Sequence, residues 1–345
     1  IPSYVAMLIA ILHGPFNYLY IYGLDLGYKG AAFATTMSQI VGPTLMILYL
    51  LCTKSGRKRL PSSTHYTIPF KDLIKEAILN LSGIYQYLSL AFPGIVIISE
   101  WWASEVAVFL SGTLTPDSSY ALDGMTIYQA INTSCFMIPV GCSVAASTRV
   151  GNLLGANNPS GAKFASIISI AAGIMLSTFI GGILWFTPHT YFPSLFDPDD
   201  KVTSETARTI PYLSFYVLAD GVQMTLNGVI KGCGRQPIVM PIVIVAYWSV
   251  GVPLAYYFAF VKNGGTTVCE SNEREFSLCG IAGLTAGMTI GTYVHFVLLA
   301  IAVAGTTWVN EAKKAQLRLR KTSSREEYPN TPTPDAEAFN LQETE

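Results

Sequence analysis

Three acidic residues lie within stretches of this chain that are otherwise apolar enough to cross a lipid bilayer: Glu100, Glu105 and Asp220. A charged carboxylate at membrane depth is costly unless it is protonated, paired or hydrated, so each residue indicates a functional site. No Lys or Arg occupies the middle of any such stretch, so we expect the three acids to have no basic partner at their depth. A group that is neutral when protonated and needs a cation when ionised is suited to exchanging protons for a substrate.

The segment PGIVIISEWWASE (93–105) places two of these acids beside aromatic rings. Glu100 and Glu105 are separated by about 140° around a helix, so at least two sides of that helix must face protein or water. Trp101 and Trp102 lie one helical turn before Glu105. Aromatic faces next to a carboxylate suit an organic cation. The alternative is an interfacial tryptophan belt with a snorkelling glutamate.

For other polar residues within apolar stretches, the sequence allows two roles. Tyr128, Asn132 and Cys135 follow helical spacing, with Gln129 beside them, and this stripe either lines a cavity or forms hydrogen bonds between helices. Asp220, near the middle of its stretch, has the alternative role of a neutral acid hydrogen-bonded to a neighbouring helix.

The histidines and cysteines give no indication of a metal site. His13 and His295 are isolated, and we expect both to be packing residues. The cysteines form no CxxC pair, and Cys269 and Cys279 either form a disulfide or are free thiols. The sequence contains neither the GxxxxGKS of an ATP site nor HExxH. We therefore expect a protein that is not an enzyme, has no cofactor, and draws energy from an ion gradient, with protons favoured over Na⁺.

Composition indicates the class of protein that positions these residues. Of the 345 residues 51% are hydrophobic and only 12% are charged, with a mean hydropathy of +0.41. These values predict an all-α, polytopic membrane helix bundle. We expect eight membrane spans of about 20 residues each, at 3–22, 31–53, 88–112, 124–146, 163–186, 208–230, 238–261 and 280–305.

Basic residues gather on one side of this predicted bundle. When alternate connections are assigned to opposite sides, one side holds 16 of the 21 Lys and Arg residues. That side contains 54–79, the tail and two short connections between spans. The positive-inside bias places it, and the C-terminus, in the cytoplasm.

The connections suggest how the chain is divided. The 54–79 segment is expected to be a cytoplasmic loop between two bundles, and 308–345 a cytoplasmic tail that is first basic and interfacial and then disordered. Because the chain opens at Ile1 directly into an apolar span, we expect upstream helices to be missing. An aromatic helix followed by a small-residue face occurs at 13–39 and again at 250–291, which indicates duplicated bundles or ordinary close packing.

Four stretches together resemble the eukaryotic multidrug and toxic compound extrusion (MATE) family. They are HGPFNYLYIYGLDLGYKGAA (13–32), PGIVIISEWWASE (93–105), PVGCSVAASTRVGNLLGANNPSGAK (139–163) and NGVIKGCGRQ (227–236). The resemblance implies twelve helices in two six-helix lobes, with 1–53 as the last helix pair of the first lobe and 80–307 as the second lobe.

The resemblance also implies a function. The family exports organic cations and other xenobiotics in exchange for protons by alternating access, and Glu100, Glu105 and Asp220 match acidic positions implicated in coupling and substrate binding. Trp101, Trp102, Tyr128, Gln129 and Asn132 are candidate cavity-lining residues. Ala130 replaces a further Glu found in some animal members, so substrate range is not carried over.

The expected partners are small organic cations and the bilayer of a plasma or vacuolar membrane. We expect a monomer with no nucleic-acid partner. Two alternatives are a truncated bundle that does not transport and a flippase for lipid-linked precursors. A flippase would be expected to have a cationic central cavity for phosphates.

Overall fold

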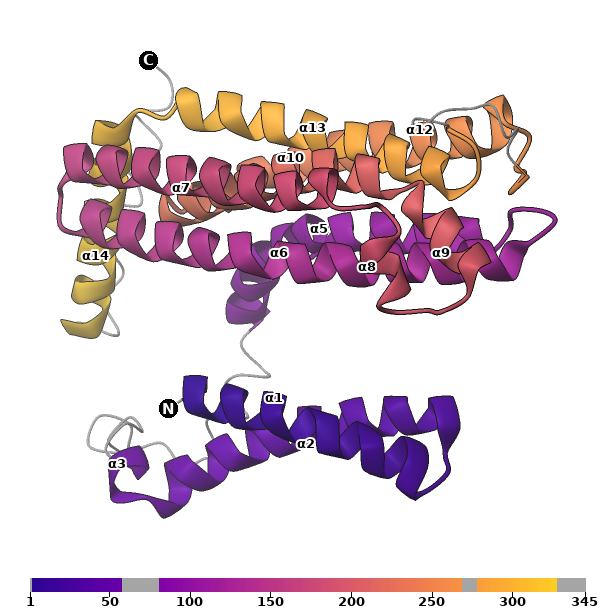
Figure 1. Cartoon of the computed structure of the whole chain (residues 1–345). Coiled ribbons are helices and arrows are strands. Elements are labelled where there is room, and N and C mark those ends of the chain that lie inside the picture. Colours follow the sequence, from indigo (N-terminus) through magenta and orange to yellow (C-terminus); the bar gives the residue numbers. More distant parts are fainter. Residues whose placement is uncertain (1, 58–80, 269–277, 328–345) are drawn as a thin grey trace. The chain divides into compact units, whose positions relative to one another are not determined.

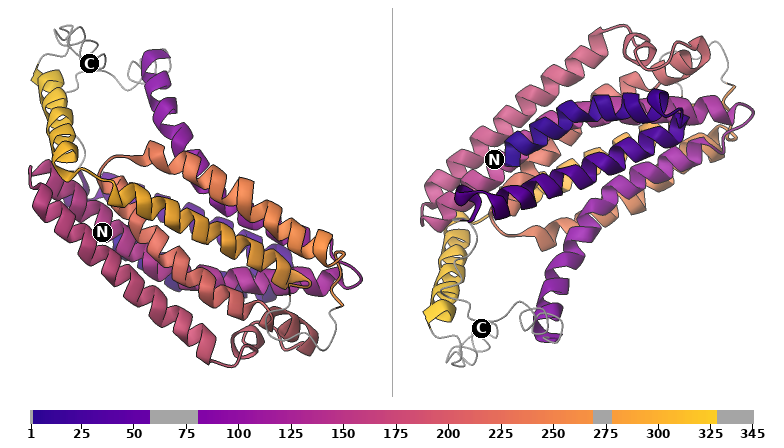
Figure 2. Two further views of the ribbon diagram at one scale, coloured as in Figure 1. Left: turned by 90° about the horizontal axis from the view of Figure 1, so that it is seen from above. Right: turned by 90° about the horizontal axis from the view of Figure 1, so that it is seen from below.

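The computed structural model describes residues 2–57, 81–268 and 278–327 and divides the chain into two compact units, Ile1–Tyr85 and Gln86–Glu345. Both units are built from long helices (Figures 1 and 2). Most of the 54–79 segment and the tail beyond residue 327 lie outside the described residues, and so does Cys269, for which the sequence left a disulfide and a free thiol open.

The first unit is an antiparallel helix pair (Figure 1). The end of its first helix approaches the start of the second so closely that a Cβ on Gly30 would lie 2.5 Å from the carbonyl oxygen of Tyr20. His13 joins the two helices through a 2.9 Å contact between its Nδ1 and Ser38 Oγ, as expected for a packing histidine. The elements of this unit are α1 (Pro2–Tyr18), the π-helical η1 (Leu19–Gly23), α2 (Gly27–Cys52) and the short α3 (Lys54–Arg57).

The second unit contains the candidate site and begins within α5. Its long helices run alongside one another, and short helices cap one end of the bundle (Figure 1). Its elements are α5 (Leu81–Ser111), α6 (Ser118–Gly155), α7 (Pro159–Phe186), α8 (Tyr191–Ser194), α9 (Asp200–Ala207), α10 (Ile210–Gly232), η2 (Gln236–Ile238), α11 (Val239–Val243), η3 (Ile244–Gly251), α12 (Val252–Tyr256), η4 (Tyr257–Lys262), α13 (Ile281–Ala304) and α14 (Trp308–Glu327).

Helix α10 is the centre of this unit, packed against α6, α7 and α13, with 18 of its 23 residues buried. Among the described residues seven helical segments are long and apolar enough to span a membrane, one fewer than the eight predicted. The predicted span 208–230 corresponds to α10, which is absent from those seven. Because protein rather than lipid surrounds α10, it can carry polar residues such as Asp220, Gln223 and Asn227.

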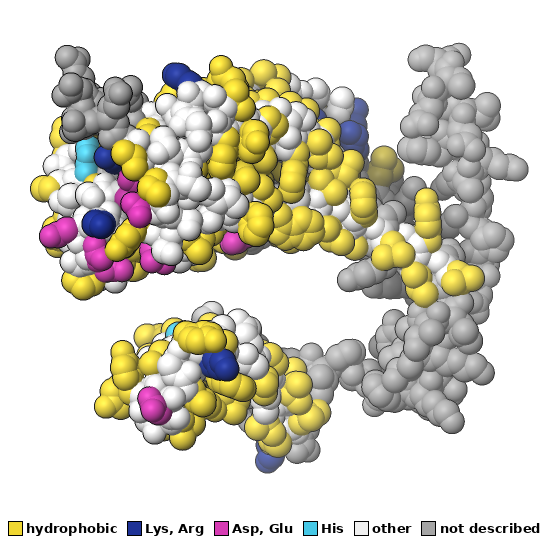
Figure 3. Space-filling view, turned by 90° about the vertical axis from the view of Figure 1, so that its right-hand side faces the viewer, with side chains coloured by type: hydrophobic (Ala, Val, Ile, Leu, Met, Phe, Trp, Pro, Cys, Tyr) yellow, Lys and Arg dark blue, Asp and Glu magenta, His cyan; other side chains and the backbone are white. Residues whose placement is uncertain are grey.

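The surface of the second unit reflects a membrane environment. Hydrophobic side chains cover the flank of the bundle shown in Figure 3, and Asp and Glu residues gather toward one end. Exposed apolar residues of α7 include Phe164, Met175 and Phe179. Helix α6 has 38 residues, and such a helix is roughly 57 Å long. It therefore extends beyond a hydrocarbon layer of about 30 Å.

Glycines allow α13 to pack closely against the helix before it. A Cβ on Gly291 would lie 2.8 Å from both the Ala246 carbonyl oxygen and the Gly251 Cα. The preceding segment contains two π-helical stretches, η3 and η4. In each unit an aromatic helix thus ends in a π-helical turn and is followed by a helix with a small-residue face.

A buried carboxylate lies where α9 meets the start of α13. Glu205 Oε2 is 3.8 Å from Arg208 Nη1, and its carboxylate accepts a hydrogen bond from the backbone N–H of Ile281. Burial raises the pKa of Glu205 above its usual value, while Arg208 and the Ile281 N–H act in the opposite direction. Gly280, which precedes α13, adopts φ 61° beside this carboxylate.

The basic segment after α13, predicted to be an interfacial anchor, forms α14 and packs against the ends of α6 and α7. Arg235 Nη1 donates a 2.7 Å hydrogen bond to Thr306 Oγ1, and Arg235 Nε lies 4.0 Å from the buried carboxylate of Glu311. Gln316 Nε2 donates a 2.7 Å bond to the Gly155 carbonyl oxygen at the end of α6. The first part of the predicted tail is therefore held by directed polar contacts.

Candidate functional site

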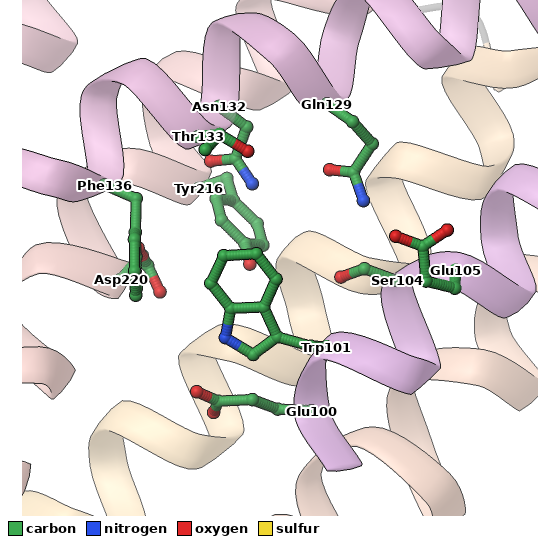
Figure 4. Close-up of a pocket in the computed structure, with 10 residues that line it drawn as sticks. All are labelled: Glu100, Trp101, Ser104, Glu105, Gln129, Asn132, Thr133, Phe136, Tyr216 and Asp220. Atoms are coloured by element: carbon green, nitrogen blue, oxygen red, sulfur yellow. The ribbon is translucent and has the colours of Figure 1, made fainter. Parts of the chain in front are cut away.

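All three acids singled out in the sequence line one pocket in the second unit. Glu100 and Glu105 project from α5, and Asp220 projects from α10 (Figure 4). Asp220 is buried and the Glu100 side chain is only 11% exposed, whereas Glu105 is exposed at the mouth. The cavity has a volume of about 70 Å³. It is lined by Glu100, Trp101, Ser104, Glu105, Gln129, Asn132, Thr133, Phe136, Tyr216 and Asp220.

Aromatic rings form much of the pocket wall. The rings of Trp101 and Phe136 meet edge to face at a centroid distance of 5.2 Å, and Figure 4 shows the Trp101 indole in the middle of the site. Tyr216 contributes a third ring from α10. Trp102 was expected to line the same cavity, but it does not line the pocket and is 53% exposed. Trp101 lies on the pocket side of α5, and Trp102, about 100° further round the helix, lies outside the lining.

The predicted polar stripe on α6 is divided between two faces of that helix. Gln129 and Asn132 line the main pocket, and Tyr128 lines a smaller adjoining cavity together with them. Cys135 instead faces an apolar groove of about 450 Å³ between α6 and α7. Within the described residues the Tyr128 hydroxyl and Asn132 Oδ1 have no hydrogen-bond partner, so both are available to a ligand or to water.

A glutamine joins the two buried acids. Gln223 lies one turn after Asp220 on α10, and its Nε2 is 3.4 Å from Glu100 Oε2 and 3.3 Å from Asp220 Oδ1. The same nitrogen lies 3.3 Å from the hydroxyl of Tyr247. One fully buried amide therefore connects α5, α10 and η3 at the base of the pocket.

His295, expected from the sequence to be an isolated packing residue, lies instead beside Glu100. Its side chain is fully buried on α13, and its Nδ1 lies 3.5 Å from Glu100 Oε2 and 3.4 Å from the Tyr247 hydroxyl. Tyr247 also lies 3.3 Å from Thr292 Oγ1. His295 is thus a member of the polar cluster around Glu100 rather than an isolated packing residue.

The π-helical η3 positions two aromatic residues against this cluster. Tyr247 points toward Gln223 and His295, while Trp248 Nε1 donates a 3.0 Å hydrogen bond to Ser99 Oγ on α5. Single-turn π-helical insertions are frequent at functional sites. The sequence analysis did not predict Tyr247 or Gln223. The signals available were a tyrosine inside an apolar span and a glutamine at i+3 from Asp220.

Comparison with known proteins identifies the family. The MatE family model matches residues 84–257, which is half of the chain and includes all three acids of the pocket. The chain belongs to the MatE family. The resemblance to the MATE family stated from the sequence is thereby confirmed, and so is the all-helical, multi-pass membrane fold.

Curated relatives and solved MATE structures extend the match. Protein DETOXIFICATION 17 of Arabidopsis thaliana is 31% identical over 320 residues, covering 91% of this chain and 60% of the relative. Protein DETOXIFICATION 14 of the same plant is 30% identical over 303 residues, covering 87% of this chain and 56% of the relative. The crystal structure of the eukaryotic MATE transporter AtDTX14 superimposes with a TM-score of 0.73 at 28% identity, covering 92% of this chain and 65% of that chain.

A second solved structure, MATE in the bent conformation, has a TM-score of 0.61 at 18% identity and shows the shared fold. It covers 91% of this chain and 64% of that chain. This chain spans about three fifths of the length of the curated MATE relatives that it matches.

Proposed function

We propose that this chain is part of a secondary active antiporter that exports organic cations in exchange for protons by alternating access. The observation that carries the proposal is the convergence of Glu100, Glu105 and Asp220 on one pocket whose other lining residues are aromatic or neutral and polar. No Lys or Arg is among the ten lining residues. Carboxylates beside aromatic faces favour a cation, because both attract positive charge.

The chemistry of exchange follows from competition for the same oxygens. When Glu100 and Asp220 are ionised, a cationic substrate neutralises them. When protons bind these carboxylates, the attraction to the substrate is lost and the substrate is released. Coupling then requires that the occupied and protonated states favour different access to the two sides of the membrane.

The size of the pocket limits how a substrate binds. A cavity of about 70 Å³ is much smaller than the roughly 300–1,000 Å³ of typical drug-sized sites. Trp101 is 41% exposed and Glu105 is exposed, so the pocket opens at their positions. We infer that a substrate places its cationic head between the carboxylates and leaves its apolar body outside this cavity.

We further propose the arrangement in the membrane. Residues 1–53 form the last helix pair of the first lobe, and 80–307 form the second six-helix lobe, with α10 as its central helix. The positive-inside bias supports a cytoplasmic position for the basic end and for α14. A plasma or vacuolar membrane suits an exporter of this kind, and the protein acts as a monomer.

Two alternatives remain in competition with this proposal. A flippase for lipid-linked precursors would need cations for phosphate groups, and the absence of Lys and Arg from the pocket lining argues against it. A bundle that does not transport would have no use for three acids around one cavity, which argues against a purely structural protein.

The test uses the intact protein in sealed vesicles loaded with a fluorescent organic cation. An imposed pH gradient should drive efflux of the cation and a matching movement of protons. The variant Asp220→Asn should abolish this exchange while the protein still inserts and folds. Efflux that is independent of the pH gradient, or unchanged in Asp220→Asn, would refute the proposal.

A further inference from the structure

His295 is a buried titratable residue for which the exchange described above has no role. Its side chain is fully buried, and Nδ1 faces both Glu100 and Tyr247, while Nε2 has no partner among the described residues. A packing histidine would normally have its polar atoms satisfied by neutral neighbours. His13 is such a case, with Nδ1 bonded to Ser38.

The surroundings of His295 make Glu100 the acidic group nearest to it. Titratable residues from four neighbouring helical elements face the same cluster directly or through Gln223 and Tyr247. Lys231 acts electrostatically on Glu100 from the end of α10. The titratable residues of α12 and η4 are on the exposed side. The facing residues are Glu100 of α5, Tyr128 of α6, Tyr216 and Asp220 of α10, and Tyr247 of η3.

Geometry favours proton exchange between the imidazole and the carboxylate. The 3.5 Å separation between His295 Nδ1 and Glu100 Oε2 is at the outer edge of hydrogen-bonding distance. The Tyr247 hydroxyl, 3.4 Å from the same nitrogen and bonded to Gln223, holds the imidazole in this orientation.

We propose that His295 is a positioning residue that exchanges a proton with Glu100 and acts as its resident counter-ion when no substrate is bound. A proton entering the pocket adds to the lone pair of Nδ1, which gives an imidazolium facing the carboxylate. The Nδ1–H bond then breaks as an O–H bond forms on Oε2, which leaves neutral imidazole and a neutral carboxylic acid. The inference rests on the proposed function and deepens it.

As a consequence, the Glu100 carboxylate has three alternative partners. Glu100 pairs in turn with substrate, with imidazolium or with its own proton, and so never remains as an isolated carboxylate in the membrane interior. Because imidazolium and substrate compete for one carboxylate, His295 sets the pH at which substrate is displaced.

The experiment follows the protonation of Glu100 directly, without requiring transport. The intact protein is titrated with acid and base while the carboxylic-acid band in its infrared difference spectrum is recorded, and Glu100→Gln assigns that band. Replacement of His295 by Gln keeps a neutral donor but removes the capacity for positive charge. In His295→Gln the protonation midpoint of Glu100 should rise by about one pH unit or more, a tenfold change in proton affinity.

Controls separate this role from packing. His13→Gln, the same substitution at a histidine bonded to Ser38, should leave the midpoint unchanged. An unchanged midpoint in His295→Gln, or a shift only in His295→Phe, would overturn the proposal, because the histidine would then act only as a neutral group.

A second measurement covers the case in which His295→Gln does not fold. Nitrogen NMR of histidine-labelled protein should show an imidazolium signal for His295 that is lost in Glu100→Gln. An identical histidine titration in both proteins would overturn the proposal. Neither measurement depends on transport, so failure here is distinguishable from failure of the exporter assignment.

Discussion

Gly291→Ala tests whether the close approach of α13 to η3 maintains the polar cluster. The added Cβ would lie 2.8 Å from the Ala246 carbonyl oxygen, whereas ordinary contact begins at 3.4 Å, so the backbones must separate by about 0.6 Å. His295 lies one turn after Gly291 on α13, and Tyr247 is adjacent to Ala246. The same displacement would lengthen the 3.4 Å contact between His295 and Tyr247 to about 4.0 Å, beyond hydrogen-bonding distance.

The expected cost combines two opposing effects. Overpacking lowers the free energy of unfolding by about 1–3 kcal/mol. Replacing a helical glycine by alanine raises it by about 0.5–1 kcal/mol. We expect a net loss of up to about 2.5 kcal/mol, measured as reduced stability in detergent by thermal or denaturant unfolding, together with impaired exchange. Gly182→Ala on α7 is the matched control, since nothing lies within 4 Å of its added Cβ and it should be neutral or stabilising. Equal stability of the two variants would refute the argument from close approach.

Three further predictions concern groups at the mouth of the pocket and at the two ends of the bundle. Glu105→Gln should abolish efflux driven by a pH gradient without reducing the amount of folded protein, as measured in vesicles. Because burial raises the pKa of Glu205, its contribution to stability is present below its unfolded pKa of about 4.5 and is lost as pH rises through the raised folded value. Unfolding measured against pH should show this decline in the wild type and a weaker one in Glu205→Gln, and identical slopes would contradict it. Arg235→Gln leaves the buried Glu311 without one of its cations and should destabilise the docked α14 by about 1–3 kcal/mol. Limited proteolysis should then cleave α14 faster than in the exposed control Lys313→Gln, and equal rates would count against the docking role.

Much of the fold was predictable because the bilayer imposes length and hydropathy on lipid-facing helices. The span at 163–186, for example, corresponds to α7 at Pro159–Phe186. Helix α10 (Ile210–Gly232) matches the expected span 208–230 in position, but it is not apolar enough to count among the seven described helices that could span a membrane. A helix surrounded by other helices is released from the requirement for apolar side chains, so hydropathy describes it poorly.

The acids of the site were predictable for a related reason, since a carboxylate in an apolar span has few structural explanations. The residues that contact these acids in the structure could not be predicted in the same way. His295 and Tyr247 come from segments distant in sequence, and their convergence on Glu100 depends on packing of α13 against a π-helical segment. A π-helical turn shifts the phase of every later side chain, so regular helical spacing from the sequence cannot place Tyr247. Which of the two neighbouring tryptophans, Trp101 or Trp102, lines the pocket likewise depends on where α5 contacts its neighbours.

Labelling of carboxyl groups with a hydrophobic carbodiimide, which reacts with protonated acids, tests the central claim most directly. Mass spectrometry of the labelled protein reports each acid separately, with and without an organic cation. We predict that Glu100, Glu105 and Asp220 are all modified at low pH and that one cation protects all three over the same concentration range. Protection of only one acid, or equal labelling with and without the cation, would contradict a single site shared by proton and substrate.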